Sequence, residues 1–186
     1  MGAAAATRQL QRIAAKVKVI CVNNFNYGMT GGQLAPTTPE YYATSTAPFG
    51  STELPFNLPY LAQSCGAVYV ARWTVYHVKQ LQRAIKEAML KPGFTFVEVL
   101  SPCPTLYVRR NKLGDSLAVM QDYKERSVVK NGIDAREADL DQEKPIVCGK
   151  FVDIDRQSYL KTSVEQLTRK LGDRYRMPQT WRDVLS

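Results

Sequence analysis

Apolar and polar positions alternate along the chain in a way that predicts an α/β fold. Short apolar runs rich in β-branched residues predict strands over Val17–Val22, Ala67–Val75 and Phe94–Leu100. Apolar residues at helical spacing predict a helix over Val78–Leu90, which Lys91-Pro-Gly93 ends. Because strands alternate with helices, we expect a parallel sheet with helices on its faces.

Shorter patterns predict the remaining elements. Gly2–Lys16 is rich in alanine and has helical spacing, and Asn57–Cys65 predicts a short helix closed by Gly66. The other predicted elements are helices near Leu113–Val129 and over Ser163–Leu171, and a strand over Pro145–Val152.

Two stretches of the chain lack a regular pattern. The residues from Asn23 to Pro55 are dense in Pro, Thr and Gly, which is typical of a functional or a disordered loop. From Asn131 onward the sequence is charged and irregular. We therefore expect a partial α/β domain over residues 1–130 and a C-terminal extension over residues 131–186. The extension is interpreted as an arm that packs on the domain or on a neighbouring subunit.

Size and composition narrow the class of protein. With 186 residues and 45% hydrophobic composition, the chain is the size of one domain with a sizeable core. No apolar run approaches the length of a membrane span, and residues 1–8 lack the pattern of a secretory signal. A cytoplasmic protein without membrane contact is expected. Four cysteines without a Cys-x-x-Cys pair argue against a zinc site and a disulfide scaffold: Cys21, Cys65, Cys103 and Cys148.

The net charge of +8 comes from 25 basic and 17 acidic residues. A basic chain can bind nucleic acid, but Lys and Arg are scattered here and no recognition motif is present. We expect a solvated basic surface and no nucleic-acid partner.

The residues that follow the first predicted strand are the strongest candidate for a functional site. From Asn23 to Pro39 they read Asn-Asn-Phe-Asn-Tyr-Gly-Met-Thr-Gly-Gly-Gln-Leu-Ala-Pro-Thr-Thr-Pro. Open α/β sheets bind ligands just beyond the carboxyl ends of such strands, and glycines let the backbone approach a phosphate closely. The alternative is a loop of Asx turns that caps the strand and binds nothing.

This stretch resembles the thiamine-diphosphate loop in the β subunit of 2-oxoacid:ferredoxin oxidoreductases, in the branch for 2-oxoglutarate or branched-chain 2-oxoacids. Further segments resemble the same family in the same order: Thr46–Gly50, Tyr69–Arg72, Thr74–Leu81, Phe94–Pro104 and Arg109–Asp115. The resemblance covers about the first two thirds of the chain. It implies part of a thiamine-diphosphate-binding fold.

The activity that the resemblance implies is oxidative decarboxylation of a 2-oxoacid. The acyl group passes to coenzyme A and electrons pass through a 4Fe-4S cluster to ferredoxin. The run Tyr27-Gly28-Met29 resembles the enzymes for 2-oxoglutarate and branched-chain 2-oxoacids more than the enzymes for pyruvate. We rank 2-oxoglutarate first among the candidate substrates. No catalytic side chain is implied, because the cofactor itself carries the reaction.

The resemblance also implies which residues bind the cofactor and its Mg²⁺. The side-chain oxygen of Asn24 and the backbone carbonyl of Asn26 are the implied Mg²⁺ ligands, since Mg²⁺ takes oxygen ligands. The residues implied to contact the cofactor are Asn24, Asn26, Tyr27, Gly28, Met29, Thr30 and Gly31. Tyr27 and Met29 would wall the pocket, or else belong to the core. Gln33, Thr37 and Thr38 match the family without an assigned role.

Cys103 lies in Ser101-Pro-Cys-Pro104, directly after the predicted strand Phe94–Leu100. Because the carboxyl ends of parallel strands share one edge, Cys103 is expected beside the loop. The resemblance implies that Cys103 is one of four thiolates around the 4Fe-4S cluster. The alternative is a structural cysteine at a strand end.

Several other polar residues have no assigned function from sequence. His77 is expected at a helix start or in the core rather than on a metal. Arg109 and Arg110 either face a carboxylate or coenzyme A, or are surface charges. Arg72 and Tyr76 are equally open.

The family signature has a second half, a Gly-Asp-Gly whose aspartate binds the metal about one βα unit upstream. The 23 residues before Asn24 contain no aspartate, and the other cluster cysteines are also absent. We therefore expect the cofactor and cluster sites to need residues that this chain lacks, through truncation, choice of start site or a split subunit.

The implied partners are the other subunits of the oxidoreductase, of α, γ and δ type, together with ferredoxin, coenzyme A and the 2-oxoacid. A basic surface would speed the encounter with an acidic ferredoxin. The competing hypothesis is a non-catalytic remnant or assembly module that keeps the fold.

Overall fold

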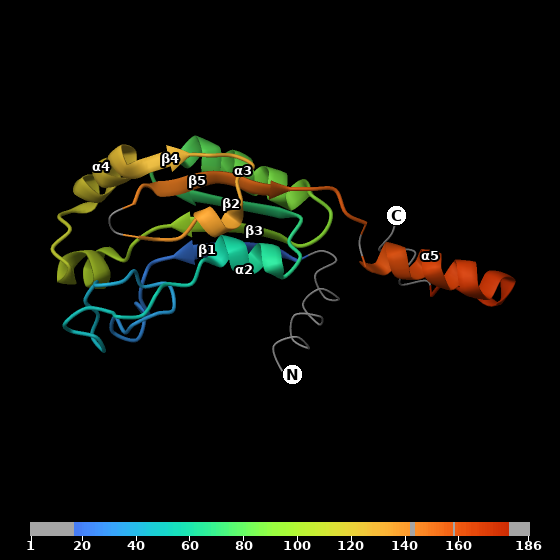
Figure 1. Ribbon diagram of the computed structural model, residues 1–186, viewed down its shortest axis with the longest axis horizontal. Coiled ribbons are helices and arrows are strands. Elements are labelled where there is room, and N and C mark those ends of the chain that lie inside the picture. The colour runs from blue at the N-terminus through green and yellow to red at the C-terminus, as the bar shows by residue number, and fades with distance from the viewer. Residues whose placement is uncertain (1–16, 142–143, 158, 179–186) are drawn as a thin grey trace.

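A computed structural model describes residues 17–141, 144–157 and 159–178, and Figure 1 shows a sheet with helices on both faces. The five strands lie in the order β1 (Lys18–Asn23), β3 (Thr95–Leu100), β2 (Tyr69–Thr74), β5 (Ile146–Asp153) and β4 (Ser127–Val129). Figure 1 places α2 (Leu58–Ser64) and α3 (Val78–Leu90) on opposite faces of this sheet. The helix predicted over Gly2–Lys16 lies outside the described residues.

The remaining elements follow the three parallel strands in the chain. They are the π-helix η1 (Pro104–Val108), α4 (Ser116–Arg126), the 3-10 helix η2 (Ala135–Glu137), α5 (Tyr159–Leu171) and the 3-10 helix η3 (Gly172–Arg174). In Figure 1, α5 extends away from the sheet beyond the end of β5. Within the described ranges, no helix is both long and apolar enough to cross a membrane.

The central strands explain why their sequences read as continuous apolar runs. Every residue of β2 and of β3 is buried, because layers cover both faces of the sheet there. On one face, Ala84 and Ala88 of α3 join Val97 in a hydrophobic core, and their small side chains let the helix lie close. On the other face, Ala62 of α2 joins Val70 in a second core.

Parallel pairing brings three strand ends to one edge of the sheet. Asn23 of β1 is level with Leu100 of β3, which is level with Thr74 of β2. The loops that follow these residues therefore begin side by side. The predicted parallel core and flanking helices are confirmed.

The sheet is nevertheless mixed, which differs from the purely parallel prediction. β5 runs antiparallel to β2, and β4 runs parallel to β5. Residues 130–145 connect β4 to β5, a length that suits a parallel crossover. β5 lies inside the predicted C-terminal extension, so that region contributes a strand to the sheet.

The helix predicted near Leu113–Val129 is shorter than expected at both ends. Gly114 has a φ of 88°, and Asp115 then caps α4 by accepting a hydrogen bond of 2.8 Å from the backbone N–H of Ala118. The β-branched residues at its end leave the helix and pair with β5 as β4.

We expect Gly149→Ala to destabilise the protein far more than Gly132→Ala. Both glycines have a positive φ, 140° and 72°, which costs a non-glycine residue about 1–2 kcal/mol. A Cβ at Gly149 would also clash with the Lys130 carbonyl oxygen, whereas a Cβ at Gly132 would meet open space. Overpacking of this kind adds about 1–3 kcal/mol. Urea unfolding of both variants measures the difference, and equal losses of stability would contradict the clash.

Candidate functional site

The loop after β1 lies against the segment that follows β3. The backbone N–H of Ser101 donates to the Asn23 carbonyl at 2.9 Å, and that of Cys103 donates to the Asn24 carbonyl at 3.1 Å. Figure 1 shows the loop, in blue to cyan, beside η1 at the same end of the sheet. The expectation that Cys103 lies beside the loop is confirmed.

Residues 27–33 form a tight turn at the surface of this loop. Tyr27 donates its N–H to the Gln33 carbonyl at 3.0 Å and accepts from the N–H of Gly32 at 2.9 Å. Gly31 has a φ of 109° and open space where a Cβ would lie. A Cβ at Gly28 would lie 3.4 Å from Asn24 Nδ2 and 3.7 Å from Cys103 Sγ. The turn therefore presents bare backbone next to Asn24 and Cys103.

Asn26 carries the clearest sign of an absent binding partner. Its side chain is 4% exposed, yet its Oδ1 atom has no hydrogen-bond partner among the described residues. Leaving such an oxygen unsatisfied costs about 1–3 kcal/mol. A cation or a donor at this position would remove that cost, so the residues present fit a bound Mg²⁺. The unpaired atom is the side-chain oxygen, whereas the resemblance implies the backbone carbonyl.

Asn24 lies next to this unpaired oxygen. Its side chain is partly buried, and its Oδ1 accepts a long hydrogen bond of 3.3 Å from the N–H of Asn26. The Asn24 side chain is thus held to the Asn26 backbone by one weak hydrogen bond. Oxygen donors in such a contact are available to a metal.

The other residues implied by the resemblance lie at the surface of the turn. Tyr27 is 53% exposed and Met29 is 100% exposed, so the alternative that they belong to the core is wrong. Thr30 and Gly31 are exposed as well. These side chains are accessible to a ligand or to another subunit.

Phe25, between the two asparagines, has a backbone conformation that non-glycine residues seldom adopt. Its φ is 65°, which costs about 1–2 kcal/mol for a residue with a Cβ. The Asn23 side chain accepts its N–H at 3.2 Å, and its carbonyl accepts the Thr38 hydroxyl at 2.7 Å. Its buried ring packs on Tyr107 with the ring centroids 5.3 Å apart. Loop and core contacts together hold this strained turn.

A cavity of about 160 Å³ is lined by Phe25, Tyr107 and Tyr123 among other residues. Burial raises the pKa of both tyrosines far above the ordinary value, so they stay neutral. The Tyr123 hydroxyl is buried without a hydrogen-bond partner among the described residues. These rings support the loop by packing and offer no charge at neutral pH.

The Cys103 thiol lies in an environment that favours its ionised form. Partial burial pushes its pKa upward, but the Thr105 hydroxyl and the backbone N–H groups of Leu106, Tyr107 and Thr105 together hold the pKa below the ordinary value. Thr105 Oγ1 lies 3.5 Å from Cys103 Sγ. In contrast, burial raises the pKa of Cys148 to about 11.

Among the polar residues without a function assigned from sequence, His77 is buried and two arginines are exposed. His77 is buried at the start of α3, with Nδ1 2.9 Å from the Thr74 hydroxyl, as expected for a helix-entry residue. Arg109 and Arg110 are exposed. Within the described ranges, no group of three or more His, Cys, Asp or Glu could hold a metal.

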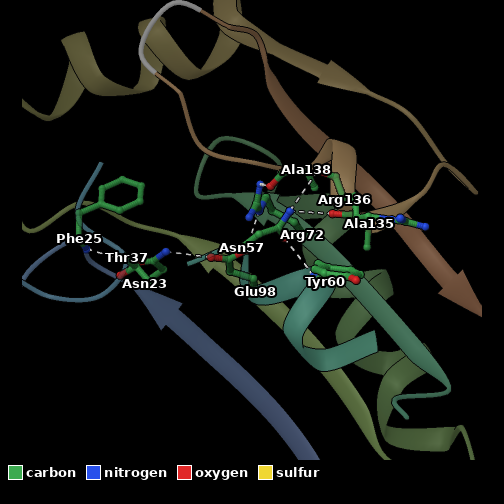
Figure 2. Close-up of polar contacts among 10 residues, drawn as sticks. All are labelled: Asn23, Phe25, Thr37, Asn57, Tyr60, Arg72, Glu98, Ala135, Arg136 and Ala138. Carbon is green, nitrogen blue, oxygen red and sulfur yellow. Dashed lines mark hydrogen bonds and ion pairs between the residues drawn. The ribbon is translucent and has the colours of Figure 1, made fainter. Parts of the chain in front are cut away.

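Sequence reasoning missed a buried polar network behind the loop, which we call the Asn23 network: Asn23, Thr37, Arg72 and Glu98. Arg72 Nε lies 2.6 Å from Glu98 Oε2, and both side chains are fully buried. Asn23 Nδ2 donates to Glu98 Oε1 at 2.8 Å, and Asn23 Oδ1 accepts the Thr37 hydroxyl at 2.7 Å (Figure 2). The available signal was one charged residue in the middle of each of two apolar strands.

The fold and the loop define an α/β domain whose candidate site lies at the carboxyl ends of its parallel strands. The sequence profile described as "Thiamine pyrophosphate enzyme, C-terminal TPP binding domain" matches residues 3–99. The chain belongs to this thiamine pyrophosphate enzyme family.

Curated relatives carry names from one class of oxidoreductase. The chain is 40% identical over 155 residues to the 2-oxoglutarate synthase subunit KorB of Methanothermobacter marburgensis, and the match covers 83% of this chain and 54% of the relative. It is 44% identical over 156 residues to the KorB of Methanocaldococcus jannaschii, and the match covers 82% of this chain and 56% of the relative. The chain thus spans about half the length of these relatives.

A solved structure shares the fold at low sequence identity. The 2-oxoglutarate:ferredoxin oxidoreductase from Magnetococcus marinus with 2-oxoglutarate, coenzyme A and succinyl-CoA bound superposes with a TM-score of 0.68 at 21% identity. The match covers 98% of this chain and 62% of that chain. The fold of this chain is therefore also found in a solved structure.

We expect Cys103 to be the fastest cysteine to react with iodoacetamide in the isolated chain. Its lowered pKa gives more thiolate near pH 8 than Cys148 or Cys21 can supply, since burial raises the pKa of both. The rate should rise with pH and level off at a pH below the ordinary pKa of a cysteine thiol. Cys103→Ser should remove the fast phase and Cys65→Ser should keep it, which mass spectrometry can follow. A fast phase that survives Cys103→Ser would contradict this.

Proposed function

We propose that this chain forms part of the β subunit of a 2-oxoacid:ferredoxin oxidoreductase, with 2-oxoglutarate as the first candidate substrate. The observation that carries the proposal is the buried, unpaired Oδ1 of Asn26, next to Asn24 and a glycine turn at the carboxyl edge of the sheet. Membership of the thiamine pyrophosphate enzyme family and the names of the relatives support it.

In this proposal the loop holds Mg²⁺ and the diphosphate of the cofactor. Asn24 and Asn26 would supply oxygen ligands to the metal, and the bare backbone around Gly28 and Gly31 would let the diphosphate approach closely. The glycines matter because side chains there would stand between the backbone and the phosphate oxygens. Thr30 adds a hydroxyl at the surface of the turn, and Tyr27 and Met29 border the cofactor.

The chain's own part in the reaction is orientation rather than proton transfer. When bound, thiamine diphosphate supplies the nucleophile and the electron sink for decarboxylation of the 2-oxoacid. The tyrosines behind the loop stay neutral, since burial raises their pKa, and they support Phe25 by packing. The loop fixes the direction in which the metal and the diphosphate face.

We assign Cys103 as one thiolate of a 4Fe-4S cluster whose other ligands come from residues absent from this chain. Two observations support this. The backbone N–H of Cys103 donates a hydrogen bond to the Asn24 carbonyl of the loop, and hydrogen-bond donors lower the pKa of the Cys103 thiol. A thiolate is the form that binds iron.

The loop also suggests contact with other subunits. Four large apolar side chains of the loop are mostly exposed: Met29, Phe49, Leu54 and Phe56. Exposed apolar side chains in one region are typical of an interaction surface. The proposed partners are the other oxidoreductase subunits, with ferredoxin, coenzyme A and the 2-oxoacid as reactants in the cytoplasm.

Asn24→Ala should raise the Mg²⁺ concentration needed for half-maximal activity about tenfold or more, because one metal oxygen is lost. The assay uses the chain assembled with its partner subunits and follows reduction of a viologen dye by 2-oxoglutarate and coenzyme A. Asn24→Asp is the matched control, since it keeps an oxygen at the same position and should stay near the wild-type requirement. An unchanged Mg²⁺ requirement in Asn24→Ala would sink the assignment.

The isolated chain is expected not to bind Mg²⁺-thiamine diphosphate tightly. Asn24 and Asn26 supply two of the about six oxygens that Mg²⁺ takes, and the described residues hold no cluster of acidic side chains around them. Calorimetric titration checks this against the assembled enzyme. Micromolar binding to the isolated chain would show that two loop oxygens are enough.

A further inference from the structure

We propose that the Asn23 network is a positioning device that sets the spacing of the Asn24 and Asn26 oxygens. This inference rests on the proposed function for its role in cofactor binding. The network itself is a property of the chain. Its hydrogen bonds reach the backbone of Phe25, which lies between the two predicted metal ligands.

The first argument concerns the orientation of the Asn23 amide. A carboxylate only accepts hydrogen bonds, so the Nδ2 end of Asn23 must face Glu98 Oε1, at 2.8 Å. The Oδ1 end then faces the Phe25 N–H at 3.2 Å and the Thr37 hydroxyl at 2.7 Å. A flipped amide would place an oxygen against the carboxylate and two donors against each other. The charge on Glu98 therefore selects one orientation.

The second argument concerns what holds Glu98 in place. Arg72 Nε binds its other carboxylate oxygen at 2.6 Å, and Arg72 Nη1 donates to the Ala138 carbonyl at 2.5 Å. Figure 2 shows this chain of contacts running from Phe25 through the sheet to the segment around η2. Both charged side chains are fully buried. A buried ion pair can often be replaced by apolar residues without loss of stability, and in some proteins such a pair specifies one structure, which is the role proposed here.

The third argument concerns where the network ends. Asn23 Oδ1 binds Phe25, two residues on, and Thr37, fourteen residues on. It thus joins the start of the loop to its far side. Phe25 has a left-handed φ of 65° and lies between Asn24 and Asn26. Its conformation decides where those two side chains point, so releasing it would change the distance between their oxygens.

The double variant Arg72→Met with Glu98→Leu separates positioning from stability. We expect its melting temperature to stay near that of the wild type, because removing the desolvated charges offsets the hydrogen bonds that Asn23 and the Ala138 carbonyl lose. We expect the Phe25 amide to exchange with deuterium about tenfold faster, since its acceptor loses its fixed orientation. Nuclear magnetic resonance on the isolated chain measures both. Wild-type exchange at Phe25 in a stable double variant would overturn the proposal.

A second set of variants tests the same proposal should the double variant fail to fold. Thr37→Val removes the hydroxyl that binds Asn23 and should speed exchange at Phe25, and Thr37→Ser should restore slow exchange. Thr95→Val is the matched control, because Thr95 is a buried threonine at the other end of β3 whose hydroxyl donates to the Ala88 carbonyl at 3.2 Å. Equal acceleration by Thr95→Val would mean general loosening and would overturn the proposal.

The assembled enzyme supplies a readout that a purely structural role would not change. Thr37→Val should raise the concentration of thiamine diphosphate needed for half-maximal activity by about tenfold, with kcat at saturating cofactor near the wild-type value. A lowered kcat with an unchanged cofactor requirement would overturn the link to the cofactor. A wild-type assembly with no need for thiamine diphosphate would overturn the proposed function instead, while the exchange results decide the network.

Discussion

A fully buried ion pair in the middle of the sheet is the constraint on which the surrounding structure depends. Arg72 and Glu98 lie on neighbouring strands, level with one another, and have no access to water. Each charge must therefore find its partners within the protein, and only Nη2 of Arg72 has none among the atoms of this pair in the described residues. Glu98 obtains its second partner from Asn23 on β1, and Arg72 obtains one from the backbone near η2. One electrostatic requirement thus links three strands, the loop and the segment before β5.

This requirement gives the two adjacent asparagines different tasks. Asn23 is 4% exposed, and both ends of its side-chain amide form hydrogen bonds within the chain. The Asn24 side-chain oxygen accepts a long hydrogen bond of 3.3 Å from the Asn26 N–H, so it has capacity for a further partner. An Asx turn and a metal-binding loop were competing interpretations of the same sequence. The structure contains the Asx turn at Asn23, and it leaves Asn24 Oδ1 with one long hydrogen bond and Asn26 Oδ1 without a partner among the described residues.

The elements with local patterns are those that the sequence predicts well. The bounds of α3 agree with its helical spacing and its Pro-Gly stop, and the buried strands agree with their apolar runs. The direction of β5 and the short strand β4 depend on pairing between distant segments, which no local pattern contains. The π-helix after Cys103 has no such pattern either.

The same distinction applies to the site. The position of Cys103 beside the loop follows from strand order, and it could be predicted. The pairing of Arg72 with Glu98 depends on the register of β2 against β3, and the left-handed turn at Phe25 depends on contacts with Tyr107 and Thr38. Neither is visible in a window of sequence. Both concern residues that support the loop rather than residues that would touch a ligand.

The short helix η1 has one further consequence, because it serves two neighbours at once. Its N–H groups face the sulfur of Cys103, and its Tyr107 ring supports Phe25. A displacement of η1 would therefore disturb the thiolate and the loop in the same movement. The sulfur and the loop thus share one support, which is a segment of only five residues.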